Sequence, residues 1–265
     1  MIRATAVLLS IITCAVASTA VAQDAAPNIG IVVMHGKSGS PSRLVNRLTE
    51  GLETKGLLVA NLEMPWAGRR NYDKDIAGAE QEVSAALQVL RDKGAKKVFV
   101  AGHSQGGVFA LHYASKHPID GLIIIAPGGN VGTSFYQGKV GASVSRARDL
   151  VASGKGNERG GFDEFEGAKG NWTVNTTAAI YLTWFDPEGA MNQMKSSRAL
   201  PKTLPVLHVA PTSDYPALMR AKNEMFDALP DHPLKKLYEP EADHRGAPAA
   251  SVDEIARWTA QVSAR

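Results

Sequence analysis

Short apolar segments alternate with longer amphipathic ones along most of this chain. The short segments are rich in aliphatic and β-branched residues and are bounded by glycine, proline or charged residues. Their hydrophobicity is continuous rather than alternating, which is typical of strands that are covered on both faces in a parallel sheet. The predicted strands are residues 29–34, 57–64, 97–101, 121–126, 205–210 and 234–238.

The segments between these strands have helical periodicity. One example is the stripe of Ile76, Val83, Leu87 and Leu90, whose spacing places all four on one helix face and predicts a helix that ends near Gly94. Alternation of strands and helices builds right-handed βαβ crossovers and a doubly wound sheet. We therefore expect an α/β fold with a mostly parallel sheet of about six or more strands.

Composition excludes several other classes of protein. The chain has 265 residues, of which 44% are hydrophobic, and its 25 glycines follow no fixed period, so neither a disordered chain nor a collagen is expected. The net charge is +3, and the basic residues are scattered, mostly singly or in pairs. We expect no nucleic-acid partner, because such proteins carry a basic stripe or patch. A chain of this length can fill one core, so we expect a single domain.

Residues 1–22 have the pattern of a secretory signal peptide. Arg3 provides a positive start, residues 4–16 are apolar and uncharged, and small residues precede a predicted cleavage site after Ala22. A transmembrane anchor is the alternative, because no charge follows Arg3 within the segment, but serine and threonine dilute its hydrophobicity. We expect a periplasmic or secreted protein.

Cleavage would leave residues 23–265 as the mature domain, with no stable membrane insertion. Cys14, the single cysteine of the chain, would leave with the signal peptide. The mature protein would then have neither a disulfide nor a thiol nucleophile.

One long stretch, residues 128–200, departs from the alternation. It is rich in glycine, serine, threonine and asparagine, and shows helical fragments only near residues 143–153 and 176–184. It is too long for a bare loop and too poor in apolar runs to form a core of its own. We expect a cap-like insertion after the fourth strand, lying over one edge of the sheet and shaping a pocket.

The pentapeptide Gly-His-Ser-Gln-Gly at residues 102–106 matches the pattern G-x-S-x-G. By itself this pattern is short enough to arise by chance, but here it directly follows a predicted strand and precedes a helical segment at residues 108–116. A nucleophile elbow requires that strand-to-helix turn, with small residues two positions before and after the serine. Ser104 is therefore the candidate nucleophile.

On these residues the chain resembles the α/β-hydrolase superfamily, over most of the mature sequence. A second point of resemblance is His35-Gly36 at the end of the first strand. The resemblance implies an oxyanion hole made by the backbone amides of Lys37 and Gln105. The short layout also has some likeness to dienelactone-hydrolase-like proteins, but those use a cysteine where this chain has Ser104.

A serine hydroxyl needs a base, and the chain order of the superfamily places an acid and then a histidine after the serine. By elimination among seven histidines, His244 is the candidate base, because it follows the last strand at the carboxyl edge of the sheet. Asp214, after the preceding strand, is the candidate acid that orients it. Asp186 and Asp243 are the alternatives. The histidines excluded as the base are His35, His103, His112, His117, His208 and His232.

The loop after the second strand should also reach the carboxyl edge. Trp66, Arg69 and Tyr72 in this loop are candidates to contact an anionic or aromatic part of a substrate, together with His35. The alternative is that Trp66 packs beneath its own turn and that His35 packs beneath the elbow.

These residues predict a serine hydrolase, carboxylesterase-like, that cleaves a small-molecule ester through an acyl-enzyme. A peptidase or lactonase with the same residues is the alternative within the enzymes, and a non-catalytic ligand-binding protein of this fold is the alternative outside them. We expect no metal and no organic cofactor, because no zinc-ligand spacing and no phosphate-binding loop occurs in the sequence.

Overall fold

A six-stranded parallel sheet forms the centre of the fold in the computed structural model, which describes residues 29–167 and 169–265. Its strands follow the order β2-β1-β3-β4-β7-β8, and every neighbouring pair is parallel. This confirms the predicted α/β fold. The predicted signal peptide and Cys14 lie outside the described residues. The strands are β1 (Ile29–Met34), β2 (Leu58–Leu62), β3 (Lys97–His103), β4 (Gly121–Ile125), β7 (Val206–Val209) and β8 (Lys236–Tyr238).

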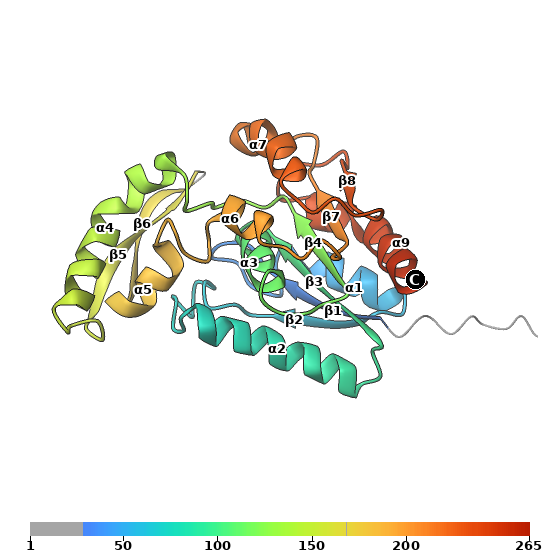
Figure 1. Cartoon of the computed structure of the whole chain (residues 1–265), viewed down its shortest axis with the longest axis horizontal. Coiled ribbons are helices and arrows are strands. Elements are labelled where there is room, and N and C mark those ends of the chain that lie inside the picture. The colour runs from blue at the N-terminus through green and yellow to red at the C-terminus, as the bar shows by residue number, and fades with distance from the viewer. Residues whose placement is uncertain (1–28, 168) are drawn as a thin grey trace, which may run out of the picture.

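Helices cover both faces of the sheet, which explains why its central strands carry apolar side chains on both faces (Figure 1). On one face, side chains such as Ile31 pack with α1 (Asn46–Thr54) and α9 (Val252–Ser263). On the other, side chains such as Met34 pack with α2 (Ile76–Asp92) and α3 (Gln105–Ala114). Each fully buried aliphatic or aromatic side chain stabilises the fold by about 1.5–3 kcal/mol.

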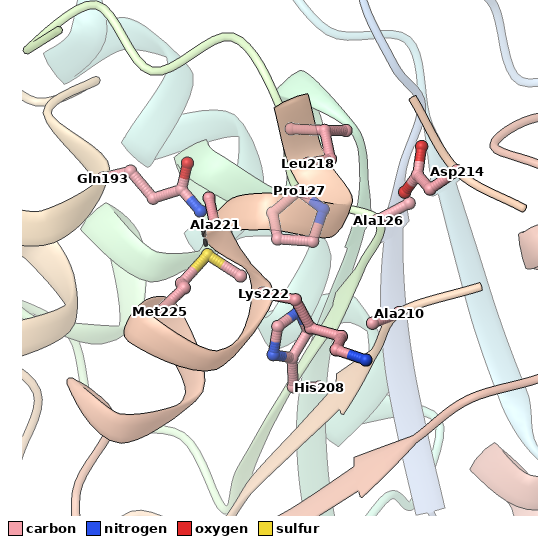
Figure 2. A pocket seen from close by; sticks show the side chains of 10 residues that line it. All are labelled: Ala126, Pro127, Gln193, His208, Ala210, Asp214, Leu218, Ala221, Lys222 and Met225. Atoms are coloured by element: carbon pink, nitrogen blue, oxygen red, sulfur yellow. Dashed lines mark hydrogen bonds between the residues drawn. The ribbon is translucent and has the colours of Figure 1, made fainter. Parts of the chain in front are cut away.

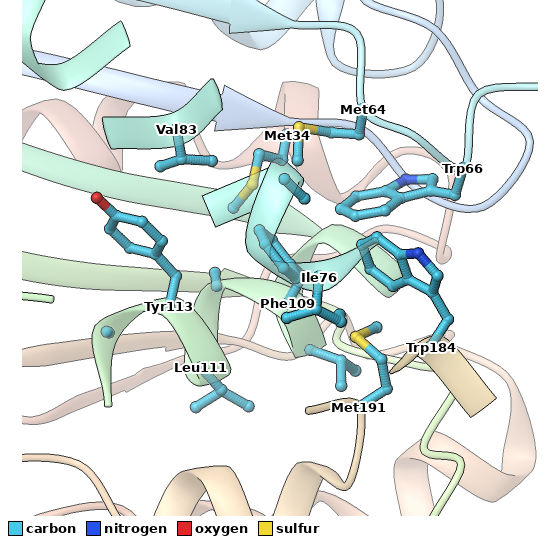
Figure 3. Close-up of a cluster of buried hydrophobic side chains, with 14 of the residues drawn as sticks. Met34, Met64, Trp66, Ile76, Val83, Phe109, Leu111, Tyr113, Trp184 and Met191 are labelled. Atoms are coloured by element: carbon cyan, nitrogen blue, oxygen red, sulfur yellow. The ribbon is translucent and has the colours of Figure 1, made fainter. Parts of the chain in front are cut away.

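The core beneath α2 and α3 is rich in aromatic and methionine side chains (Figure 3). Trp66 belongs to this core and makes edge contacts with Phe109 of α3 and with Trp184. The two remaining helices of the main domain follow the strands at the end of the chain. They are α7 (Pro216–Asp227) and α8 (Ala247–Ala250). Within the described residues, no helix is both long enough and apolar enough to cross a lipid bilayer.

The insertion predicted at residues 128–200, here called the cap, contains helices and a β-hairpin beyond the carboxyl ends of the strands (Figure 1). The antiparallel hairpin was not predicted, because its apolar residues alternate with charged and polar ones. Its Phe162 and Val174 join the same hydrophobic cluster as Met34, so the cap shares the core of the sheet. The elements are α4 (Ser134–Ala152), β5 (Arg159–Glu166), β6 (Gly170–Thr177), α5 (Ala178–Phe185) and α6 (Gln193–Arg198).

Candidate active site

Ser104 lies at a sharp turn between β3 and α3, with backbone φ of 54° and ψ of −119°. Positive φ is strained for a residue with a side chain, so the surrounding structure must hold this turn in place. A Cβ on Gly102 would lie 2.0 Å from the carbonyl oxygen of Gly106. A Cβ on Gly106 would lie 2.7 Å from the carbonyl oxygens of Met34 and His35. The two glycines of the motif are therefore required by close backbone packing.

The side chains of Ser104, His244 and Asp214 form a chain of two hydrogen bonds. Ser104 Oγ lies 3.0 Å from Nε2 of His244 and donates to it, and Nδ1–H of His244 donates to Oδ1 of Asp214 over 2.8 Å. The ring of His244 and the carboxyl of Asp214 are buried, whereas Ser104 is partly exposed. This arrangement can take the proton of the serine hydroxyl and stabilise the imidazolium that forms.

The loops that carry the acid and the base are tied to each other. Asp214 follows β7, His244 follows β8, and Ser213 N–H donates to the carbonyl of Ala242 over 3.0 Å. The N–H of Tyr215 donates to Oδ1 of Asp214 over 2.6 Å, which fixes the carboxyl group. Parallel strands end at the same edge of the sheet, so residues far apart in the chain meet there.

The two alternative acids have other partners. Asp186 pairs with Arg148 of the cap, and Oδ1 of Asp243 accepts from the N–H of Gly246. Among the described residues, Asp214 is the carboxylate that accepts a hydrogen bond from His244.

His103, which was excluded as the base, contacts the backbone of His244. Its Nε2–H donates to the carbonyl of His244 over 2.9 Å, and the two rings lie 4.9 Å apart. Burial, followed by the nearby His244, lowers the pKa of His103 to about 3, so this ring stays neutral. Spacing in the sequence gives no signal for this contact, because 141 residues separate the two histidines.

The two predicted oxyanion amides lie at the elbow. A Cβ on Gly36 would lie 3.1 Å from Cβ of Ser104, so the loop that carries Lys37 packs directly against the nucleophile. Within the described residues, no backbone carbonyl accepts a hydrogen bond from the N–H of Lys37. Gln105 is the first residue of α3, where a helical N–H has no acceptor within its own helix.

His35 and Trp66 hold the loops beneath the elbow. Nε2 of His35 accepts from the N–H of Met64 over 3.1 Å, and Nδ1–H donates to the carbonyl of Gly36 over 2.7 Å. Burial lowers the pKa of His35, which favours this neutral form. The indole N–H of Trp66 donates to the carbonyl of His35 over 3.0 Å. Both side chains are buried, in the arrangement given above as the alternative to substrate contact.

The other two candidates of this loop also have partners. Arg69 is exposed and pairs with Glu63. Tyr72 is buried, and its hydroxyl contacts Gln105 and the carboxyl of Glu164 from the cap. The structure therefore brings Tyr72 to the residue after the nucleophile and leaves Arg69 on the surface.

Leu218 of α7 and Tyr215 just before it lie close to Ser104 and His244, and neither was predicted from the sequence. A Cβ on Gly128 would lie 3.2 Å from Cδ1 of Leu218 and 3.7 Å from Oγ of Ser104. The ring of Tyr215, 40% exposed, lies 4.6 Å from the ring of His244. Only the fold places α7 beside the nucleophile, so no local pattern reveals these contacts.

A small cavity of about 40 Å³ lies behind Asp214, lined also by His208, Lys222 and Met225 (Figure 2). This volume has room for a water molecule and is far smaller than a substrate pocket. Across the described parts of the chain, no group of three or more His, Cys, Asp or Glu side chains is arranged to hold a metal ion.

A protein-family model described as serine aminopeptidase, S33, matches residues 25–155, which include Ser104 and end before Asp214 and His244. A search of curated proteins finds no match. Solved structures resemble the chain over most of its length. A monoacylglycerol lipase from Paleococcus ferrophilus is 19% identical, with a TM-score of 0.58 over 88% of this chain and 94% of its own.

Two further structures extend this likeness. A thermostable carboxyl esterase from Bacillus coagulans, in complex with glycerol, is 17% identical, with a TM-score of 0.61 over 89% of each chain. A dienelactone hydrolase from Anabaena variabilis is 16% identical, with a TM-score of 0.52 over 86% of this chain and 84% of its own.

The sheet, the elbow and these likenesses define the class by its fold: the chain has the α/β-hydrolase fold, and its residues 25–155 match the family model named above. The solved structures that share this fold with it include a lipase and a carboxyl esterase.

Proposed function

We propose that this protein is an exported serine hydrolase that cleaves a small carboxylic ester through a Ser104–His244–Asp214 triad. The observation that carries the proposal is the chain of hydrogen bonds at 3.0 and 2.8 Å, which starts at a strained serine in a nucleophile elbow. A binding protein has no need to hold a serine at positive φ against a histidine.

The proposed reaction has two halves. In the first, Oγ of Ser104 attacks the ester carbonyl carbon, and its proton passes to Nε2 of His244. His244 then gives this proton to the leaving alcohol, which leaves the acyl group on Ser104. In the second half, His244 takes a proton from water, the resulting hydroxide attacks the acyl carbonyl, and the acid departs as Ser104 regains its proton.

Each half passes through a tetrahedral intermediate with a negative oxygen. The N–H groups of Lys37 and Gln105 are proposed to donate to this oxygen, since both belong to the segments that meet at the elbow. The loss of one such donor typically costs about 3 kcal/mol in transition-state stabilisation. Asp214 contributes by holding His244 in the tautomer whose Nε2 accepts the proton of the serine.

The surroundings of Ser104 support an ester with an apolar acyl group. Leu218 is half-buried, and Tyr215 and Met219, just before and within the first turn of α7, are exposed. Gly128 places no side chain between Leu218 and Oγ of Ser104, and we propose that the acyl chain passes along this side of the nucleophile. Apolar pockets with a few placed polar groups are typical of small-molecule sites.

The direct test is hydrolysis of a graded series of chromogenic esters by the protein that starts at Gln23. Ser104→Ala and His244→Ala should each reduce kcat by about 10⁴-fold or more. Ser115→Ala, at the other end of α3, is the matched control and should retain wild-type activity. Retained turnover in Ser104→Ala would overturn the mechanism.

A peptidase is the second candidate, because the matching family model is described as a serine aminopeptidase. Amide substrates with a free amino terminus, assayed beside the esters, distinguish the two. A kcat/KM for the amide above that for the matched ester would favour the peptidase.

Export is proposed from the sequence of residues 1–22. Expression of the whole chain in a Gram-negative host, followed by fractionation and mass measurement, should give a periplasmic product that starts at Gln23. An uncleaved product in the membrane fraction would favour the anchor.

A further inference from the structure

One carboxylate of the cap hairpin, Glu164, is completely buried and fully surrounded by donors. Its Oε1 lies 2.8 Å from Nζ of Lys37 and accepts from the hydroxyl of Tyr136 over 2.6 Å. Its Oε2 accepts from the hydroxyl of Tyr72. Burial, and to a smaller extent the charge of Glu164, raises the pKa of each tyrosine well above its usual value. Both hydroxyls therefore keep their protons and donate.

The ammonium of Lys37 is held in the same way. Besides Glu164, it donates to the hydroxyl of Tyr136 and to the carbonyl of Phe165, each over 2.7 Å. An ammonium has three N–H donors, so these contacts occupy all of them. The side chain of Lys37 therefore has one fixed position against the hairpin.

Gln105 is connected to the same carboxylate from the other side. Its Nε2 donates to the hydroxyl of Tyr72 over 3.1 Å, and Tyr72 in turn donates to Glu164. Lys37 follows β1 and Gln105 begins α3, whereas Glu164 lies in β5 of the cap. The two residues assigned to the oxyanion hole thus share one anchor that neither of their own elements provides.

We propose that Glu164 is a positioning residue for the oxyanion hole: it holds the backbone amides of Lys37 and Gln105 at the distance that the tetrahedral oxyanion requires. This inference rests on the proposed function. Oxyanion donors lose most of their effect when displaced by a fraction of an ångström, so their residues must be fixed by contacts from a surrounding layer. Here that layer comes from the cap, which makes the cap part of the catalytic geometry.

A purely structural tie between cap and sheet makes a different prediction. Loss of such a contact would lower thermal stability or weaken substrate binding. The affinity for an oxyanion mimic would then fall by the same factor as the affinity for the substrate. A positioning role acts on the transition state and should reduce kcat. A boronic acid adds to Ser104 as a tetrahedral anion, so its inhibition constant measures the same stabilisation of a negative oxygen.

The test compares Glu164→Gln with the wild type on one chromogenic ester and one alkyl boronic acid. The amide keeps the shape of the carboxyl but removes its charge, so we expect kcat to fall about tenfold with KM within about twofold, and the boronate inhibition constant to rise by the same factor as kcat/KM falls. Glu158→Gln is the control, because Glu158 is an exposed glutamate that immediately precedes β5. It should leave all three quantities unchanged.

A second variant avoids leaving the buried ammonium of Lys37 without its carboxylate partner. Loss of one partner of a buried ion pair strongly destabilises a protein, whereas replacement of both partners is often neutral. Lys37→Met/Glu164→Gln should therefore keep a melting temperature near that of the wild type and still show the loss in kcat and in boronate affinity. Wild-type kcat and boronate affinity in either folded variant would overturn the inference alone. Inactivity of the wild type on every ester and amide would instead overturn the proposed function, and the inference with it.

Discussion

Oγ of Ser104 lies 3.0 Å from Nε2 of His244, although 140 residues separate the two in the chain. The contact exists because β3 and β8 are parallel strands of one sheet and end at the same edge. The carbonyl of His244 is held in addition by Nε2–H of His103, the residue before the nucleophile. The elbow therefore supplies both the nucleophile and a support for its base.

Asp214→Asn should leave the fold intact and reduce kcat on the ester by about 10³–10⁴-fold, because the amide favours the wrong tautomer of His244 and cannot stabilise the imidazolium. Asp186→Asn is the matched control, since Asp186 pairs with Arg148 in the cap. Steady-state kinetics of both variants check this. A near wild-type rate in Asp214→Asn would show that the acid is assigned wrongly.

Gly102→Ala should prevent folding or lower the free energy of unfolding by more than about 3 kcal/mol, because its Cβ would lie 2.0 Å from the carbonyl oxygen of Gly106. Gly138→Ala is the contrasting change. It lies within α4, where a Cβ meets no atom within 4 Å, and should stabilise the protein by about 0.5–1 kcal/mol. Urea denaturation measures both, and a stable Gly102→Ala protein would contradict the account of the elbow.

Gly128→Ala should change the preference for acyl groups. The added Cβ would lie 3.2 Å from Cδ1 of Leu218 and 3.7 Å from Oγ of Ser104, so it fills the space proposed for the acyl chain. We expect kcat/KM to fall about tenfold more for octanoyl than for acetyl esters. Leu218→Ala in the same background should recover part of the loss. Equal losses for all chain lengths would place the acyl group elsewhere.

Acid should destabilise this protein, and His208 should contribute to the effect. Burial, followed by the nearby Lys222, lowers its pKa from 6.5 to about 3, and the same cavity is lined by Asp214 (Figure 2). Between these two values the unfolded chain binds a proton that the folded chain does not. The stability is therefore fully present above pH 6.5 and is lost as the pH falls toward 3.

Each such histidine should contribute on the order of 1 kcal/mol of lost stability per pH unit. His208→Leu should make the dependence of the free energy of unfolding on pH less steep by that amount, because the leucine has no proton to gain. Urea denaturation at several pH values checks this. An unchanged slope in His208→Leu would mean that the ring is protonated in the native state.

The sequence predicted the features whose cause is local. Continuous apolar runs located the strands, because both faces of the sheet are covered, and two glycines around a serine after a strand located the elbow. Chain order predicts the acid and the base at the ends of β7 and β8, and in the structure His244 contacts Ser104 while Asp214 contacts His244. The hairpin of the cap was missed, because its alternating strands lack such runs.

Tertiary structure decided which polar and aromatic residues meet. Trp66 and Tyr72 share a loop with Arg69, yet the first is buried in the core, the second contacts the cap and the third is exposed. Glu164 contacts Lys37 directly and Gln105 through Tyr72, although it lies 127 and 59 positions after them in the sequence. Periodicity determines which face of an element is buried, but the packing of one element against another determines which side chains touch, and that depends on the whole chain at once.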